Sequence, residues 1–323
     1  MCQTAVFYGE ALARYGFGGS HPFGTDRLGA FWSKLQSENI GNVVVEEPVL
    51  GNDRDALSFH DREYVELVRA ASKRGGVLLD RGDTPAFKGV LEASLYVVGS
   101  TLAALDMVVA GRDGAGRKID HAFNPIGGLH HARRDTAGGF CVFNDIGVAI
   151  LAAREKHGTK RIAYVDIDAH HGDGVFYEFE DDPLLFIADI HEDGRNLYPG
   201  TGSANESGKG LAAGTKLNIP LEPGAGDDEF IDSFGRIQQF VDSVKPELII
   251  LQCGADGLAG DPITHLQYSS RAHKFAADSL HRLAHKHCEG RIIALGGGGY
   301  NKANIGSAWT EVLRSFANND LRL

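Results

Sequence analysis

The chain has 323 residues, 43% hydrophobic and 23% charged, which is typical of a globular protein with a sizeable core. Its 32 basic and 43 acidic residues give a net charge of −11, so it lacks the basic surface of a DNA- or RNA-binding protein. The four cysteines form no CxxC pair, there is no leader-like N-terminus and no run of 18 apolar residues, so we expect a cytoplasmic protein without a membrane span.

The first hundred residues are expected to be helical and rich in loops. Apolar residues recur at helical spacing in 24–39 and 60–75, and 87–110 indicates a long, mostly buried helix. The glycine-rich segment 111–117 is too short to separate two domains. We therefore expect a single domain over residues 1–323.

From about residue 119, short apolar segments alternate with longer helical ones. The expected strands are 119–123, 161–167, 184–190, 247–252 and 291–295, and the expected helices are 144–158, 228–244, 269–287 and 301–317. This alternation predicts an α/β fold in which helices sandwich a parallel β-sheet.

Four of the expected strands are followed by polar, chemically rich loops. Their sequences, in chain order, are NPIGGLHHARRD, DIDAHHGDG, CGADGLAGDP and GGGGYN. Parallel strands end at the same edge of a sheet, and ligands bind beyond the carboxyl ends of such strands. We therefore expect one site at the C-terminal ends of the strands.

The second of these loops offers metal ligands. In an extended chain alternate residues share a face, which would turn Asp166, Asp168 and His170 to the same side. Asp168 and His170, with Asp256 from a later strand, would give one imidazole and two carboxylates and leave a position for water, as a catalytic zinc site requires. The alternative is a buried ion pair at a strand end, but three other polar loops at the same edge favour the metal site.

Two carboxylate ligands would nearly cancel the charge of a divalent metal, so the pKa of its bound water would fall less than in a three-histidine site, and the site would need a separate base. His130 and His131 are the candidates, and Asp166 and Asp173 are available as carboxylates behind their rings. Tyr300, after four glycines, could direct its hydroxyl at a developing oxyanion. Taken singly, each motif is also compatible with a polar turn or a core tyrosine.

Together and in this order, these blocks resemble the histone deacetylase superfamily, which includes zinc-dependent lysine deacetylases, acetoin-utilisation proteins and acetylpolyamine amidohydrolases. The matching stretches run from residue 58 to past 300: SFHDREYVELV, GDTPAFKG, GGLHHARRDTAGGFCVFND, YVDIDAHHGDGV, LYPGTG, LQCGADGLAGDP and LGGGGYN. The segment HPFGTDRLGAFW (21–32) is similar to the N-terminal part of some members. The resemblance implies an arginase/deacetylase-like fold.

The resemblance also implies roles for particular residues. Zinc, or alternatively ferrous iron, would be bound by Asp168, His170 and Asp256, and a structural potassium ion would lie near Asp166, Asp168 and His170. The proton-transfer and polarising groups would be His131 as general base and then acid with Asp173 behind it, His130 backed by Asp166, and Tyr300 on the acyl carbonyl.

Substrate-binding positions follow from the same resemblance. Gly139 and Phe140 match one wall of the acyl-lysine tunnel, and Asp83 matches a rim aspartate that holds the substrate backbone. Tyr198 stands where many members have a second tunnel phenylalanine, which makes that wall more polar. Ile263 replaces the glutamate of a polyamine-selective relative and removes one charge that could recognise a polyamine.

The expected function is metal-dependent hydrolysis of an acyl amide, with acetyl as the acyl group and a lysine side chain as the amine. The first alternative is a small-molecule deacetylase acting on acetylpolyamines or other acylated amines. A ureohydrolase with two manganese ions is a second alternative, although His130 and His131 stand where bridging carboxylates would be needed. A third is a non-catalytic sensor of acylated amines, which would have no need of a proton shuttle.

Overall fold

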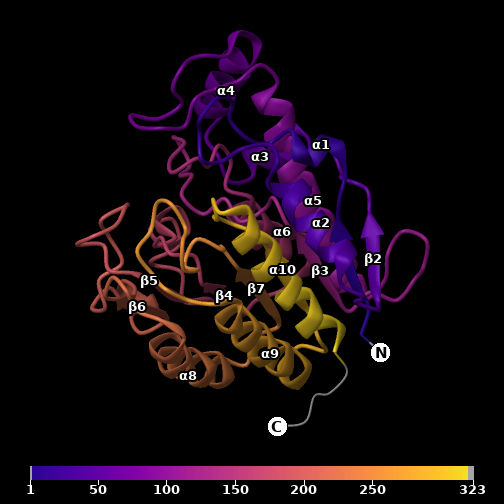
Figure 1. The fold of residues 1–323 in the computed structure, drawn as a ribbon, viewed down its shortest axis with the longest axis vertical. Coiled ribbons are helices and arrows are strands. Elements are labelled where there is room, and N and C mark those ends of the chain that lie inside the picture. Colours follow the sequence, from indigo (N-terminus) through magenta and orange to yellow (C-terminus); the bar gives the residue numbers. More distant parts are fainter. Residues whose placement is uncertain (1, 319–323) are drawn as a thin grey trace.

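The computed structural model describes residues 2–318 and contains one eight-stranded sheet in which every neighbouring pair is parallel (Figure 1). The strand order is β2-β1-β3-β8-β7-β4-β5-β6. The strands are β1 (Thr4–Phe7), β2 (Val43–Glu46), β3 (His121–Asn124), β4 (Ile162–Asp166), β5 (Leu185–Glu192), β6 (Lys216–Leu221), β7 (Leu248–Gln252) and β8 (Ile292–Leu295). The prediction of a parallel sheet sandwiched by helices is confirmed.

Helices cover both faces of this sheet. They are α1 (Glu10–Ala13), α2 (Arg27–Ser37), α3 (Asp53–Leu57), α4 (Arg62–Arg74), α5 (Val90–Ala110), α6 (Asp145–His157), α7 (Asp173–Phe176), α8 (Asp227–Val244), α9 (Ser270–His287) and α10 (Lys302–Ala317), with a 3₁₀ turn at Gly210–Ala212. On one face α10 packs between α2 and α9, and α9 packs on α8; on the other, α5 packs on α6, β3 and β8 (Figure 1). The central strands β4, β7 and β8 are therefore fully buried, as their continuous apolar sequences predict.

The long helix α5 is apolar and long enough to cross a membrane by length and composition alone. In the folded chain 61% of its most apolar window is buried, against the sheet and α6. It begins after Gly89 and ends at Gly111, both with left-handed backbone. This is the behaviour of a core helix, as the sequence pattern of 87–110 indicated.

Three strands were missed by the sequence reading, two of them in the segment expected to be only helical and looped. β1 and β2 have four residues each, too few for a period-two pattern to stand out. β6 contains Lys216 and Pro220, which are uncommon in strands and made it hard to recognise from the sequence. The proline is tolerated because β6 is an edge strand. The ammonium of Lys216 is buried and donates to the carbonyl of Leu185 at 2.6 Å.

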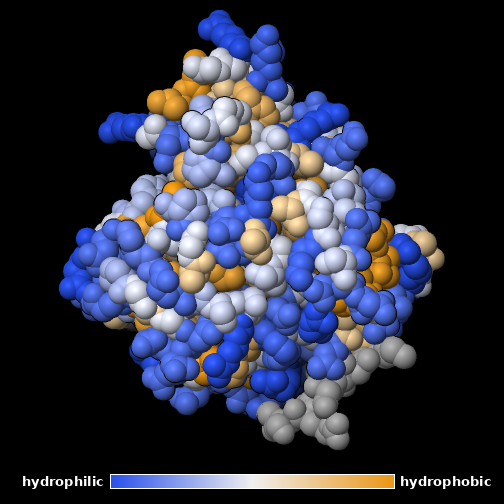
Figure 2. All heavy atoms as spheres, viewed as in Figure 1, coloured by the Kyte–Doolittle hydropathy of each residue, from blue (hydrophilic) through white to orange (hydrophobic). Residues whose placement is uncertain are grey.

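The surface agrees with the acidic, hydrophilic composition. Figure 2 shows a mostly hydrophilic face with apolar side chains in small, scattered groups. Large exposed apolar side chains in the described part of the chain include Leu211, Leu78 and Leu50. They come from separate segments of the chain.

Candidate active site

The carboxyl ends of β3, β8, β7 and β4 lie side by side, so the polar loops that follow them meet at one edge of the sheet. A small, narrow cavity opens between these loops. Its lining contains Phe23, Gly128, Leu129, His130, His131, Gly139, Cys141, Asp168, His170, Gly297, Gly298 and Tyr300. Three of the four polar loops supply lining residues, and Asp256, from the loop after β7, lies behind the lining with its carboxylate against His170.

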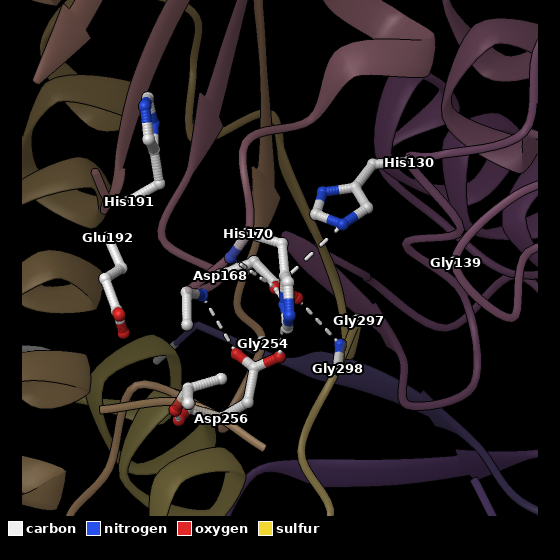
Figure 3. Close-up of polar contacts among 12 residues, drawn as sticks. His130, Gly139, Asp168, His170, His191, Glu192, Gly254, Asp256, Gly297 and Gly298 are labelled. Carbon is white, nitrogen blue, oxygen red and sulfur yellow. Dashed lines mark hydrogen bonds and ion pairs between the residues drawn. The ribbon is translucent and has the colours of Figure 1, made fainter. Parts of the chain in front are cut away.

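At the floor of the cavity, Asp168, His170 and Asp256 form a buried cluster. Nδ1 of His170 lies 3.1 Å from Oδ1 of Asp168 and 3.0 Å from Oδ2 of Asp256, and Figure 3 shows both carboxylates turned toward this ring. The expected reason for the convergence was wrong, because β4 ends at Asp166 and the chain bends after it. Asp168 and His170 are placed by this bend rather than by strand alternation.

The electrostatics of the cluster favour a bound cation. Burial alone would lower the pKa of His170, but hydrogen bonds to Asp168 and Asp256 outweigh it and raise that pKa to about 10. Burial and the charge of Asp168 raise the pKa of Asp256 to about 7. Both shifts show that the cluster attracts positive charge, and one imidazole with two carboxylates is a donor set that fits zinc or ferrous iron.

Next to the cluster, the rings of His130 and His131 are joined at 3.0 Å through their Nε2 atoms. Nδ1 of His130 donates to Asp166 at 2.8 Å, and Nδ1 of His131 donates to Asp173 at 2.7 Å. Burial would lower the pKa of His130, but the charges of Asp166 and Asp168 outweigh it and raise that pKa to about 9. Burial and the neighbouring His130 lower the pKa of His131 to about 4, so His131 is neutral and can accept a proton.

Close backbone approach explains several glycines around the cluster. A Cβ on Gly254 would lie 2.0 Å from Oδ2 of Asp168, and one on Gly298 would lie 2.2 Å from Oδ2 of Asp256. The same Asp168 oxygen accepts hydrogen bonds from Gln252 Nε2 at 2.7 Å and from Gly298 N at 2.8 Å. The sequence reading missed Gln252 and the role of Gly254, although both lie at the end of the strand that leads to Asp256.

Tyr300 is held at the cavity by contacts to its backbone. Its amide donates to Asp261 at 2.9 Å, and its ring lies edge-on to Phe140 at 5.7 Å. The buried guanidinium of Arg27 donates to the carbonyls of Gly299 at 2.8 Å and Gly297 at 2.6 Å, which ties α2 to the glycine loop. Burial raises the pKa of the Tyr300 hydroxyl, so it stays protonated and able to donate. Arg27 and Asp261 were not singled out from the sequence.

Of the predicted substrate-binding residues, Gly139 and Phe140 lie beside the cavity, and Tyr198 and Asp83 line a groove next to it. Gly139 lies against His131, where a Cβ would come within 2.3 Å of the ring, and the neighbouring Phe140 has a positive φ of 69°. Tyr198 is half exposed and lies edge-on to His131 at 5.0 Å. Together with the exposed Asp83, Tyr198 lines a groove that adjoins the cavity through His131.

Ile263 is the exception among these positions. It is partly buried and its amide donates to Asp261 at 3.1 Å. It lines neither the cavity nor the adjoining groove. Its place therefore gives no direct contact with the cluster.

The predicted potassium position also fits the local charges. Asp166 and Asp189 are paired in register on β4 and β5, and both are fully buried. Burial raises the pKa of Asp166 to about 6; the charge of Asp189 acts in the same direction, and the nearby His130 acts against it. Closely spaced buried carboxylates of this kind suit a hard cation with oxygen ligands.

Comparison with known proteins places these features in a family. A model of the histone deacetylase domain matches residues 21–316. The acetoin utilization protein AcuC of Bacillus subtilis (strain 168) is 36% identical over 98% of this chain and 81% of its own length, and AcuC of Staphylococcus xylosus is 32% identical over 96% and 81%. The crystal structure of the HDA15 HD domain superposes with a TM-score of 0.87 at 26% identity, covering 98% of this chain and 90% of that chain.

Proposed function

The chain belongs to the histone deacetylase family, and we propose that it is a zinc-dependent hydrolase that removes an acetyl group from an amine such as a lysine side chain. We further propose that residues 1–323 form one catalytic domain and that it acts in the cytoplasm. A deacetylase chemistry follows from the family, whereas the metal, the substrate and the residue roles are our proposal.

One observation carries this proposal: a buried cluster of one imidazole and two carboxylates adjoins the His130–His131 pair, whose rings are each hydrogen-bonded to a further carboxylate. Asp168, His170 and Asp256 would hold the zinc ion. When bound, zinc would polarise the acyl carbonyl and lower the pKa of a water molecule, so that a neighbouring base can deprotonate it for attack. A structural potassium ion would lie beside Asp166 and Asp168.

The protein groups around the cluster have complementary tasks. His131 would accept a proton from the attacking water at Nε2, and the hydrogen bond from its Nδ1 to Asp173 would stabilise the resulting cation. Tyr300 would donate its hydroxyl hydrogen to the acyl oxygen as negative charge develops there. His131 would then return its proton to the leaving amine, with the cationic His130 beside it favouring this return.

The surroundings of the cavity support a slender, acylated amine as substrate. Gly139 and Phe140 would form one wall, Tyr198 a more polar part of the lining toward the adjoining groove, and Asp83 at the exposed rim would accept backbone hydrogen bonds. We therefore favour a peptidyl acetyl-lysine over an acetylpolyamine, which remains the second candidate.

The proposal is tested with an acetyl-lysine peptide whose deacetylation is followed with and without a chelator. His131→Ala should lower turnover by roughly 10²–10⁴-fold, the usual contribution of a general base. His157→Ala, which removes a histidine at the far end of α6, is the matched control and should leave turnover unchanged. Unchanged turnover in His131→Ala would refute the assignment. Binding of the peptide without hydrolysis would indicate a sensor, and faster cleavage of acetylspermidine would make polyamines the substrate.

A further inference from the structure

A second group of potential metal ligands lies at the opposite edge of the sheet from the active site. Cys2 precedes β1, His121 is the first residue of β3, and His281 and His285 are four residues apart on α9. One ligand atom from each of the four side chains lies within 4.8 Å of the other three. These residues come from three distant parts of the chain and have no part in the chemistry proposed above.

Two of the distances within this group are close to those of a tetrahedral site. Nε2 of His281 lies 3.1 Å from Nε2 of His285, and Sγ of Cys2 lies 3.4 Å from the same His285 nitrogen. Zinc with Zn–N of about 2.0–2.1 Å and Zn–S of about 2.3 Å separates its tetrahedral ligands by about 3.3–3.6 Å. These two pairs therefore already stand near the spacing that the ion requires, and the remaining pairs lie within 4.8 Å.

His121 supplies an independent sign that a ligand belongs here. Its ring is fully buried, and Nδ1 donates to the carbonyl of Gly290 at 2.8 Å, which leaves the lone pair on Nε2. Among the described residues that Nε2 has no hydrogen-bond partner. A backbone carbonyl that fixes one ring nitrogen while the other faces a cluster is the usual arrangement around metal-bound histidine.

The protonation states also suit metal binding. Burial and the neighbouring histidines lower the pKa of His121 to about 3 and that of His281 to about 4, so both rings are neutral at pH 7. Burial raises the pKa of the Cys2 thiol, and a bound cation would reverse this by favouring the thiolate. The half-buried His285 lines a groove between α8 and α9, which gives an ion a route from solvent.

We propose that this group binds a structural zinc ion through four side chains: Cys2, His121, His281 and His285. Four protein ligands close the coordination sphere, which is the mark of a structural rather than a catalytic zinc site. The ion would clip the beginning of β1 to the last turns of α9. The chain would then hold two zinc ions at opposite ends of the sheet.

The test uses the full chain without an N-terminal tag, so that Cys2 keeps its surroundings. Wild-type protein should contain about two zinc ions per chain by elemental analysis, and Cys2→Ser should lose about one of them. Cys288→Ser is the matched control, because Cys288 is equally buried near the end of α9 but lies outside the group. This control should keep both ions.

Cobalt substitution separates the two sites. A thiolate ligand gives a strong near-ultraviolet charge-transfer band, and the ligands of the active site include no sulfur. The band should appear in wild type, Cys288→Ser and Asp168→Ala, and should be absent in Cys2→Ser. His281→Ala gives a second reading, with the same loss of zinc and of the band. An identical zinc content and absorption spectrum in wild type and Cys2→Ser would overturn the proposal.

Discussion

Gly254 is the position at which a single methyl group should disable the active site. Its backbone is in an ordinary conformation, so alanine brings no φ strain, and the whole effect is steric. The new Cβ would lie 2.0 Å from Oδ2 of Asp168, where contacts below 3.0 Å are essentially never seen. The carboxylate must therefore retreat by about 1 Å, several times the tolerance of about 0.2 Å for a metal–ligand distance.

The retreat also strains the hydrogen bonds that Asp168 accepts from Gln252 and Gly298. We expect Gly254→Ala to weaken the catalytic metal by at least about 100-fold, or about 2.7 kcal/mol. Deacetylase activity should be titrated against buffered free zinc, because this readout reports the catalytic ion alone. The control is Gly235→Ala within α8, where a Cβ meets nothing within 4 Å and stability should rise by about 0.5–1 kcal/mol. A Gly254→Ala enzyme with the wild-type zinc dependence and turnover would refute the reasoning.

Three further changes test other parts of the structure. Asp173→Asn keeps the shape but removes the charge behind His131, so turnover should fall by about 10–100-fold while peptide affinity changes little; equal losses in kcat and affinity would contradict this. Tyr198→Phe should change kcat/KM for an acetyl-lysine peptide by less than about 3-fold, because no hydrogen bond of its hydroxyl is seen among the described residues, and a loss above about 10-fold would show a polar role. Burial lowers the pKa of His60 to about 4, so between about pH 6.5 and pH 4 the unfolded chain takes up this proton and the folded chain does not, and the free energy of unfolding falls as the pH falls. His60→Gln should therefore reduce the loss of unfolding free energy between about pH 7 and pH 4.5 by roughly 2 kcal/mol, as measured by urea unfolding. An unchanged dependence of stability on pH would be inconsistent with a buried neutral ring.

The sequence predicted those parts of the fold whose patterns are long or strongly apolar. α9 and α10 each begin within one residue of the expected start, because Ser269 and Asn301 cap them with their side chains. β1 and β2 escaped because their place is set by pairing with distant strands rather than by local pattern. Lys216 misled in a different way, since only the tertiary structure shows which carbonyls satisfy its buried ammonium.

For the site, the loops and their chemical groups could be predicted, but not the contacts that hold them. Asp168 and His170 are conspicuous by residue type, and Asp256 follows a recognisable strand. Gln252 and Arg27 act through hydrogen bonds across 84 and about 270 residues of chain, and a sequence offers no period or spacing that reveals such bonds. The Cys2 group was missed for the same reason, since its members share no local motif apart from the pair on α9.

The order of strands has a consequence for how the chain is made. β2, β1 and β3 form one half of the sheet and β4, β5 and β6 the other, and only β7 and β8 join them. After 240 of the 323 residues have been translated, the strands of both halves exist but neither β7 nor β8 does, so any half-sheet formed by then has an unpaired inner edge. Asp168 and His170 follow β4, whereas Asp256 follows β7, which is translated later, so the full metal-binding cluster can form only late in synthesis. A nascent chain that stalls before β7 would lack the cluster and would expose strand edges that favour self-association.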